Sequence, residues 1–360
     1  MDSATAGRRL SILLIRLSAI GDIVMATPLI GALRRSFPEA SISWLVQPEL
    51  QSLLAHDPDL DSVITWPRGR WKALWKGRRL VELWKEVRRF RQMLRNRRFD
   101  LVIDLQGLLK SGAMAWFSGA PQRIGLGSRE GSRLLMTRVI ERGGNPERIG
   151  SEYLYLAHQL GLAAGDFRMN ISLSPGDEAH AAGLIGSHQL EDRFAVVCPF
   201  TTRPQKHWLD TRWVELMRRI DSELGLTPLI LGGPGDQGAA QSMVVATAGG
   251  IVNLTGKTSL TEAAALIRRA TLLIGVDTGL THMGIAFGRP TLALFGSTCP
   301  YLDTTRHDAR VIYRALPCSP CRRKPVCNGA FTCMSEIGVD EVLEQAAELL
   351  SVGQVRVQKR

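Results

Sequence analysis

Residues 12–30 read ILLIRLSAIGDIVMATPLI and carry the pattern that decides the fold. Four consecutive apolar residues, typical of a strand buried on both faces, lead into a polar turn, after which an apolar helical pattern resumes. DLVIDL (100–105) and TLLIGV (271–276) are further continuous apolar strands. Such strands alternating with helices predict an α/β fold with parallel sheets.

The same alternation extends over most of the chain. Strands are expected at 11–16, 41–46, 62–65, 100–104, 194–198, 227–232, 251–254, 271–275 and 291–295. Helices are expected near 22–36, 79–96, 151–161, 178–188, 208–224, 237–248, 260–269, 281–287 and 339–351. The series pauses around 163–180 and then starts afresh. Since 360 residues exceed the usual size of a single core, we predict two doubly wound domains.

The predicted boundaries are 1–172, 173–338 and a C-terminal helix and tail, 339–360, which could pack back on the N-terminal domain. In open α/β sheets, ligands bind beyond the carboxyl ends of the strands. Two such domains facing each other would form a cleft. The loops that end ILLIRLSAIGD and LLIGVDTGLTH are therefore the places to look for a site.

Composition narrows the function classes. No apolar run approaches the ~20 residues of a membrane span. Arg16 interrupts the apolar run near the N-terminus, so we expect no signal peptide and a cytoplasmic protein. Six cysteines in such a chain argue against a disulfide framework. The net charge of +11 predicts an anionic partner.

Asp22 follows the first strand, after a turn that ends at Gly21. An aspartate at a helix start is commonly a cap. The functional alternative is a general base, which contributes about 10²–10⁴-fold to a rate. Both interpretations remain open from the residues alone.

Two loops after buried strands are suited to phosphate. Thr201, Thr202, Arg203 and Lys206 offer hydroxyl, amide and charged donors. Asp277, Thr278 and Gly279 open a short helix, whose N-terminus favours an anion. We interpret His282 in that helix as an ordinary helix histidine.

Two other patterns are weaker evidence for a binding site. GGPGDQG (232–238) has the form GxGxxG, but no acidic residue ends the following strand, which argues against a dinucleotide enzyme. Asp57, Asp59 and Asp61 lie in a proline-containing turn, and we assign no metal to them.

Residues 66–98 contain thirteen Lys or Arg and only two Glu, interleaved with four tryptophans. Apolar residues recur at helical spacing over 79–96, so a docked helix with a solvated basic face is one interpretation. Nucleic acid and an anionic membrane surface are the two functional alternatives. The preceding residues, 68–76, are expected to be a basic loop, and we favour a phosphate-rich or lipid-linked target.

Four cysteines near the C-terminus could hold one structural zinc ion or an iron–sulfur cluster. They are Cys318, Cys321, Cys327 and Cys333. Reduced thiols without metal are the alternative, since the spacing is not that of a standard zinc ribbon.

The ordered set RLSAIGDIVMATPLIGALRRSFP, DLVIDLQGLLKSG, RIG, TTRPQKHW and GVDTGLTHMGIAFGRPTLALFGST resembles the lipopolysaccharide heptosyltransferases, glycosyltransferase family nine. The likeness runs from about residue 10 to the C-terminus, and WPRGRWKALWK looks most like heptosyltransferase I. It implies a GT-B fold of two Rossmann-like domains, with acceptor bound by the first and nucleotide sugar by the second. It also implies inverting transfer from ADP-L-glycero-D-manno-heptose to Kdo-lipid A, without a catalytic cofactor.

The resemblance implies roles for individual residues. Asp22 matches the proposed base. Donor contacts would be Thr201, Thr202, Lys206, Asp277, Thr278 and Gly279. Acceptor contacts would be Arg68, Arg70, Lys72, Lys110 and Arg123. The cysteine cluster departs from the family pattern, which leaves the subfamily and acceptor open.

The implied partners are ADP-heptose, Kdo-lipid A and the cytoplasmic membrane surface, not nucleic acid, and the implied location is the cytoplasm, peripheral to the inner membrane. The alternatives are another family-nine glycosyltransferase of core or surface polysaccharide assembly, a non-enzymatic module that binds anionic lipid, and a dinucleotide oxidoreductase.

Overall fold

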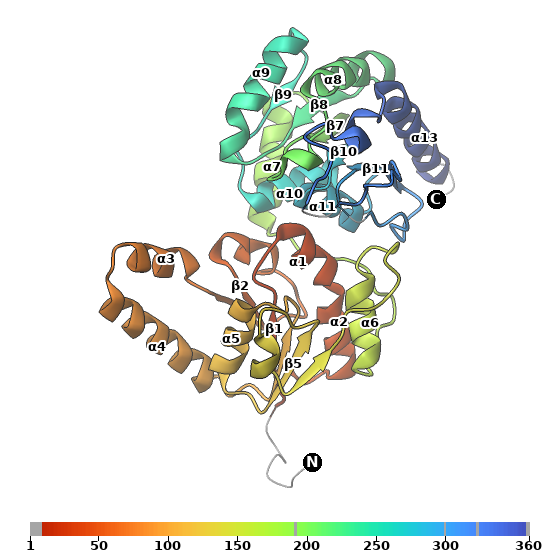
Figure 1. Cartoon of the computed structure of the whole chain (residues 1–360). Coiled ribbons are helices and arrows are strands. Elements are labelled where there is room, and N and C mark those ends of the chain that lie inside the picture. The colour runs from red at the N-terminus through yellow and green to blue at the C-terminus, as the bar shows by residue number, and fades with distance from the viewer. Residues whose placement is uncertain (1–8, 191–192, 299, 322–323, 358–360) are drawn as a thin grey trace. The chain divides into compact units, whose positions relative to one another are not determined.

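The computed structural model describes residues 9–190, 193–298, 300–321 and 324–357. By internal contacts the chain divides into two compact units (Figure 1). Unit 1 comprises Met1–Gly144 and Gly150–Ser172, and unit 2 comprises Asn145–Ile149 and Leu173–Arg360. Each unit contains one parallel sheet of six strands, so two Rossmann-like domains are confirmed.

The sheet of unit 1 has the order β3-β2-β1-β4-β5-β6. This is the doubly wound order, in which strands are added first on one side of β1 and then on the other. Its strands are β1 (Ser11–Ile15), β2 (Ser41–Val46), β3 (Ser62–Thr65), β4 (Leu101–Asp104), β5 (Gln122–Leu126) and β6 (Arg138–Ile140). Its helices are α1 (Ile20–Ala26), α2 (Pro28–Ser36), η2 (Pro48–Leu53), α3 (Arg68–Lys76), α4 (Leu80–Asn96), α5 (Leu109–Ser118), η3 (Ser132–Leu135) and α6 (Ser151–Gln159).

The first strand is central because its side chains are apolar on both faces. Ile12 pairs in register with Ile42 on one side and Leu101 on the other. Residues 12–15 are fully buried. A strand covered on both sides needs neighbours along both edges, and β2 and β4 provide them.

Unit 2 repeats this topology with the order β12-β11-β10-β7-β8-β9. Its strands are β7 (Phe194–Cys198), β8 (Thr227–Ile230), β9 (Val252–Asn253), β10 (Leu272–Val276), β11 (Thr291–Phe295) and β12 (Ala309–Tyr313). Its helices are α7 (Pro175–Ser187), η4 (Pro204–Lys206), α8 (Asp210–Leu224), η5 (Pro234–Asp236), α9 (Gln237–Thr247), α10 (Leu260–Arg269), α11 (Gly279–Phe287), α12 (Thr332–Ser335) and α13 (Val339–Val357).

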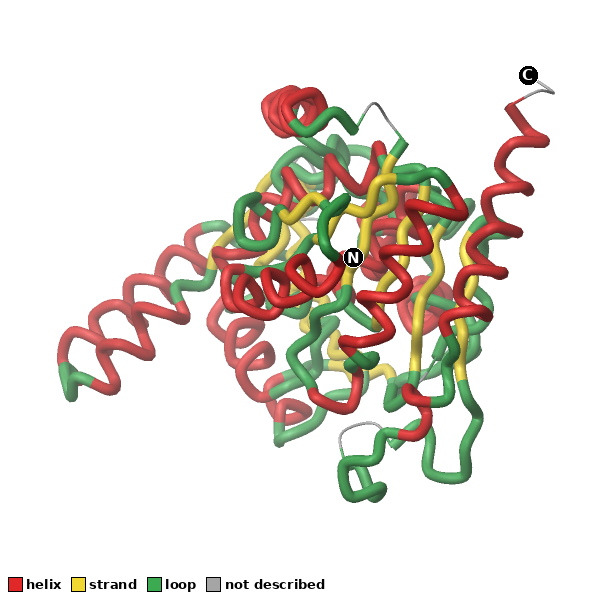
Figure 2. The backbone as a smooth tube through the Cα atoms, turned by 90° about the horizontal axis from the view of Figure 1, so that it is seen from above, coloured by secondary structure: helices red, strands yellow, loops and turns green. Residues whose placement is uncertain are grey.

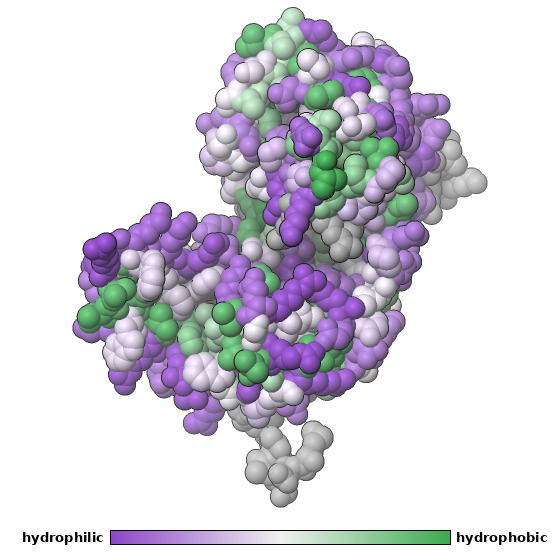
Figure 3. Space-filling model, viewed as in Figure 1, coloured by the Kyte–Doolittle hydropathy of each residue, from purple (hydrophilic) through white to green (hydrophobic). Residues whose placement is uncertain are grey.

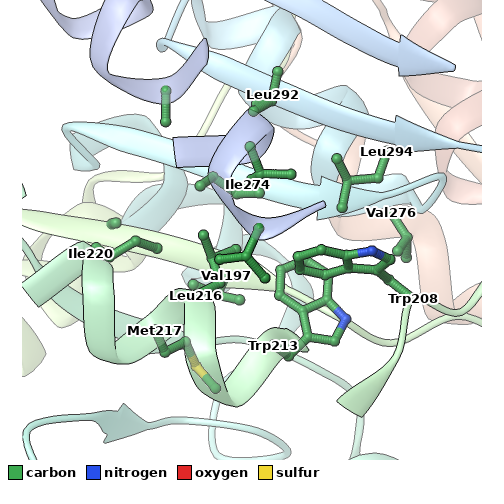
Figure 4. Close-up of a cluster of buried hydrophobic side chains, with 14 of the residues drawn as sticks. Val197, Trp208, Trp213, Leu216, Met217, Ile220, Ile274, Val276, Leu292 and Leu294 are labelled. Carbon is green, nitrogen blue, oxygen red and sulfur yellow. The ribbon is translucent and has the colours of Figure 1, made fainter. Parts of the chain in front are cut away.

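The core of unit 2 is built around two tryptophans (Figure 4). The rings of Trp208 and Trp213 meet edge to face with centroids 4.9 Å apart, and Trp208 Nε1 donates to the Ile337 carbonyl at 3.0 Å. Val342 and Leu349 of α13 are buried in the same core. The C-terminal segment 339–360, which we set apart as a region that could return to the N-terminal domain, thus contributes α13 to unit 2.

Several elements differ from the sequence-based expectation. Strands β5, β6 and β12 were not expected, since they are short and carry polar residues. The predicted helix 22–36 is two helices, because Pro28 begins α2. The basic stretch 68–76, predicted to be a loop, is the helix α3. It is held by Leu74, its one buried residue, and by ring contacts of Trp71 with Trp66 and Phe90.

Helices α3 and α4 form an antiparallel hairpin that projects from the sheet of unit 1 (Figures 1 and 2). The base of α4 joins the core through Phe90 and Leu94, while its first turns carry no buried residue. Among the described residues, no helix combines the length and apolar character that crossing a membrane requires.

Candidate active site

The first group of candidate residues lies at the carboxyl end of β1, where Arg16 and Asp22 form an ion pair. Arg16 is buried and donates from Nη1 to the Leu105 carbonyl at 3.0 Å. Asp22 lies in the first turn of α1 and accepts from the Ala19 N–H at 3.2 Å, so the capping interpretation of Asp22 is correct. Both contacts use Oδ2. The side chain is 35% exposed, and among the described residues Oδ1 forms no hydrogen bond or ion pair.

Arg16 was not assigned a role from the sequence, although a charged residue directly after an apolar strand indicates a specific partner. A guanidinium is always charged at physiological pH. Buried beneath Asp22, it keeps the carboxylate oriented without competing for its second oxygen. The arrangement thus combines a fixed carboxylate with an open oxygen, as a general base requires.

Basic side chains accumulate near Arg16, the ion-pair partner of this carboxylate. Lys110 lies in the first turn of α5, after β4. Partial burial of the ammonium group and the positive charges of Arg68 and Arg16 hold the pKa of Lys110 below its ordinary value, with Glu130 opposing them. Burial is the larger cause, and the interaction with Arg68 and Arg16 shows that Lys110 lies in a locally positive field. This field favours an anionic ligand.

The remaining predicted acceptor residues are placed differently. Arg70 is 61% exposed and pairs with Glu86 of α4 at 3.0 Å, and Lys72 is exposed on α3. Arg123 lies at the amino end of β5, the end of a parallel strand opposite to the expected site. Its guanidinium donates to the carbonyls of Leu135 and Ala120. Because its side chain ties local backbone together, we leave Arg123 out of the acceptor contacts proposed below.

Asp104 at the end of β4 is a buried carboxylate that the sequence analysis did not single out. It accepts from the N–H groups of Gln106 and Gly107, at 3.0 and 3.1 Å, and from the Ser111 hydroxyl at 2.9 Å. Burial raises its pKa despite these donors. With its acceptor capacity directed at its own loop, Asp104 shapes the turn that leads to Lys110.

The second group lies in unit 2, at the carboxyl ends of β7 and β10. Lys206 Nζ lies 2.5 Å from Asp277 Oδ2 and 3.4 Å from the Asp277 carbonyl. Both side chains are largely buried, at 17% and 12% exposure. The two loops predicted to bind the donor are therefore joined by an ion pair.

Both carboxylate oxygens of Asp277 contact neighbouring polar groups. The Thr298 hydroxyl donates to Oδ2 at 2.6 Å, and His282 Nε2 lies 3.4 Å from Oδ1. Burial by itself would raise the pKa of Asp277, but His282 and Lys206 lower it well below the ordinary range. The carboxylate is thus ionised at neutral pH and holds Lys206 in place, while one ammonium donor of Lys206 remains for a ligand.

His282 contributes more to this group than the sequence indicated. It is buried, and its Nδ1 lies 2.5 Å from the Tyr301 hydroxyl. Both ring nitrogens have partners, as expected of an ordinary buried histidine, but one partner is Asp277. Thr298 and Tyr301 were missed because they follow β11, and nothing in the sequence indicates that this loop reaches Asp277.

The other predicted donor contacts surround Lys206 and Asp277. The Thr201 carbonyl accepts from His207 Nε2 at 2.8 Å, which closes the loop before Trp208. Thr202 is exposed. Thr278 precedes α11 and makes no side-chain capping bond, and Gly279 is the first residue of the helix. The N–H groups of this first turn have no intrahelical partners and can bind an anion.

The GGPGDQG turn is not arranged for a dinucleotide. The Asp236 carboxylate accepts from the Gly233 N–H at 2.9 Å, directly before α9. A pyrophosphate would need that position, and the carboxylate charge would repel it. This geometry agrees with the sequence-based argument against a nicotinamide enzyme.

The predicted cysteine cluster has no metal-binding geometry among the described residues. In the described parts of the chain, no three His, Cys, Asp or Glu side chains form a group that could hold a metal ion. The predicted ligands lie at different depths, with Cys333 buried, Cys321 and Cys327 half-buried and Cys318 exposed. Cys321 Sγ points to the Ser297 carbonyl at 3.9 Å. The four thiols nevertheless lie close enough to interact, since burial and then the charges of Cys321, Cys318 and Cys327 raise the pKa of the Cys333 thiol. Metal binding by this cluster stays a prediction.

Comparison with known proteins identifies the family. The profile of "Glycosyltransferase family 9 (heptosyltransferase)" matches residues 87–331, more than half of the chain. The chain belongs to glycosyltransferase family 9. It is a glycosyltransferase, and the enzyme class expected from the resemblance is confirmed.

Relatives extend the match over nearly the whole chain. Lipopolysaccharide heptosyltransferase 1 of Pseudomonas aeruginosa is 30% identical over 87% of this chain and 86% of its own length. Lipopolysaccharide heptosyltransferase 2 of Escherichia coli K12 is 27% identical over 95% and 99%. The solved structure of E. coli ADP-heptose LPS heptosyltransferase II superposes with a TM-score of 0.73 at 24% identity, covering 96% of this chain and 100% of that one. The predicted GT-B fold class is thus confirmed.

Proposed function

We propose that this family 9 enzyme transfers a heptose from ADP-heptose to the Kdo-containing inner core of lipid A in lipopolysaccharide biosynthesis. The observation that carries the proposal is Asp22, whose carboxylate is held by Arg16 and Ala19 through Oδ2 while Oδ1 remains available. Support for the sugar and pathway comes from relatives named lipopolysaccharide heptosyltransferases 1 and 2. The positive field at Arg68 and Lys110 suits an acceptor bearing carboxylates and phosphates.

In the proposed reaction, the acceptor hydroxyl oxygen attacks the anomeric carbon while Asp22 takes its proton. The bond from that carbon to the diphosphate oxygen breaks, and ADP leaves with the electron pair. Attack opposite to the leaving group inverts the centre. Lys206 and the first N–H groups of α11 stabilise the charge that develops on the diphosphate.

The proposed domain roles follow from these groups. Unit 1 binds the acceptor through Arg68, Arg70, Lys72 and Lys110, and unit 2 binds the donor through Thr201, Thr202, Lys206, Thr278 and Gly279. Asp277 acts through Lys206, which it positions. Because the acceptor is lipid-linked, the enzyme would work at the cytoplasmic face of the inner membrane.

Replacing the proposed base tests the mechanism. Asp22→Asn should lower kcat about 10²–10⁴-fold, while ADP still raises the thermal transition as it does in wild type. The assay is radiolabelled transfer from ADP-heptose to Kdo-lipid A. Full activity of Asp22→Asn would remove Asp22 as the base, and a wild-type protein that transfers nothing would overturn the donor–acceptor assignment.

A second candidate acceptor is an inner core that already carries one heptose. It is favoured by the match to a heptosyltransferase 2 over 99% of that protein's length. Offering both acceptors in one competition assay separates the two, since the preferred acceptor is consumed first. A sugar nucleotide screen on the same protein would reveal any other family-nine polysaccharide activity.

A further inference from the structure

The projecting end of the α3–α4 hairpin carries large apolar side chains that no other part of the described chain covers. Trp75 is 67% exposed, Leu80 54%, Val81 69% and Trp84 59%. They form the last turn of α3 and the first turns of α4, and we call them the apolar tip. Figure 3 shows hydrophobic side chains at this end of the hairpin, surrounded by hydrophilic ones.

The tip is not needed to hold the hairpin together. That role belongs to Trp71, whose ring centroid lies 6.0 Å from Trp66 and 5.5 Å from Phe90, both buried. Leu80, Val81 and Trp84 lie within one turn of each other in α4, so they share one side of the helix. Exposing two tryptophans beside two aliphatic residues is unfavourable in water, so this side is suited to a partner.

Cations surround the tip. Lys76, Arg78 and Lys85 are exposed and form no ion pair among the described residues, while Glu82 and Glu86 are paired with Arg79 and Arg70. The Arg88 guanidinium lies 5.2 Å from the Trp84 ring centroid. Tryptophan and basic side chains are the two residue types that prefer the headgroup region of a membrane.

We propose that the apolar tip inserts into the interface of an anionic lipid bilayer, with Lys76, Arg78 and Lys85 in contact with the headgroups. A second protein copy would match the apolar residues but would be repelled by the same cations, and nucleic acid would match the cations but leave Leu80 and Val81 exposed. The interface of an anionic bilayer matches both the apolar residues and the cations. The proposal does not depend on which sugar is transferred, since it concerns the hairpin and not Asp22.

The test is cosedimentation of the full chain with vesicles, without substrates. Wild type should bind vesicles of phosphatidylethanolamine containing about a quarter phosphatidylglycerol, and bind phosphatidylcholine at least tenfold less well. Trp75→Ser/Trp84→Ser should lower partitioning onto anionic vesicles at least tenfold. Lys76→Gln/Arg78→Gln/Lys85→Gln should lower it at about 0.1 M salt, with a smaller difference at about 0.5 M.

The matched control is Leu134→Ser/Val245→Ser, which removes apolar residues of similar exposure elsewhere, at 90% and 71%. It should bind vesicles like wild type. Quenching of wild-type tryptophan fluorescence by brominated lipid gives an independent readout, which should disappear in Trp75→Ser/Trp84→Ser.

Absence of wild-type binding would overturn the proposal, as would undiminished binding of the tryptophan variant. A change from dimer to monomer in that variant, measured by light scattering, would assign the tip to a second copy instead. An enzyme inactive in transfer but bound to vesicles would leave this inference intact while removing the proposed function.

Discussion

At the scale of single residues, the two candidate carboxylates have opposite environments. Asp22 is one-third exposed and keeps one oxygen without a partner among the described residues, whereas Asp277 is buried with both oxygens occupied. The first arrangement suits proton transfer with a ligand, and the second suits the positioning of Lys206. The family resemblance had implied a base role for Asp22 and a donor contact for Asp277.

Asp277 should make stability depend on pH in the acid range. Its pKa lies below the ordinary 3.8, so the unfolded chain takes up this proton first as pH falls. Its contribution is therefore complete above the unfolded pKa and is lost below about pH 4. We expect Asp277→Asn to lower the free energy of unfolding by about 3 kcal/mol at pH 7, and by progressively less below pH 4.

Urea unfolding at a series of pH values checks this expectation. Asp340→Asn is the matched control, because Asp340 also forms an ion pair, with Arg219, but is 93% exposed. Its effect should stay near zero at every pH. A constant difference between wild type and Asp277→Asn from pH 7 down to pH 3 would contradict the interpretation of Asp277.

Gly275 should not tolerate a side chain. A Cβ there would collide with Thr281 Oγ1 and lie 2.9 Å from Cys198 Cβ, in the layer between β10, β7 and α11. We expect Gly275→Ala to destabilise by about 1–3 kcal/mol and to weaken ADP binding by displacing the start of α11. Thermal unfolding with and without ADP measures both effects.

Gly238 in GGPGDQG provides the contrast, since a Cβ there meets nothing within 4 Å. Gly238→Ala should stabilise the protein by about 0.4–1 kcal/mol. A dinucleotide fingerprint would require this third glycine for close packing. Strong destabilisation by Gly238→Ala would therefore reopen that interpretation.

At the scale of elements, the basic hairpin separates into a structural base and a projecting tip. Trp71 and Trp75 are both in α3, four residues apart, but one packs on Trp66 and Phe90 and the other is exposed. The sequence predicted the amphipathic character of α4. It could not predict α3, because a segment with four basic residues and one glycine has little helical apolar pattern of its own.

The two tryptophans should differ in their effect on stability. Trp71→Ala should lower the free energy of unfolding by about 3 kcal/mol, as expected for removal of a packed aromatic ring. Trp75→Ala should change it by less than about 0.5 kcal/mol. Denaturant unfolding of both variants decides this, and equal effects would mean that α3 is not anchored through Trp71.

At the scale of the whole molecule, the chain builds the same doubly wound topology twice. In both sheets the central strands are continuous apolar segments, and these were predicted from sequence. The missed strands, β5, β6 and β12, lie toward sheet edges, where fewer residues must be apolar. Pattern-based prediction therefore succeeded for the central strands and for the edge strands β3 and β9, and missed β5, β6 and β12.

The proposed assignment of the donor to unit 2 and the acceptor to unit 1 predicts where ADP slows exchange of backbone amide hydrogens. Hydrogen exchange of the full chain should slow in peptides covering 199–207 and 276–282 of unit 2 when ADP is added. Peptides of the α3–α4 hairpin, 68–96, should exchange at the same rate with and without ADP. Protection centred on residues 15–22 would contradict the assignment of the donor to unit 2.

By itself, the sequence determined the fold class, the number of domains and the loops in which Asp22, Lys206 and Asp277 occur, because apolar periodicity and turn residues are local properties. Only the tertiary structure decided which groups these residues contact. Lys206 and Asp277 meet because β7 and β10 are neighbours in the sheet, with Cys198 paired to Gly275. Strand order depends on contacts between residues far apart in the chain, and those contacts also bring Arg16 to Leu105 and Thr298 to Asp277. Local sequence patterns do not determine such long-range pairings.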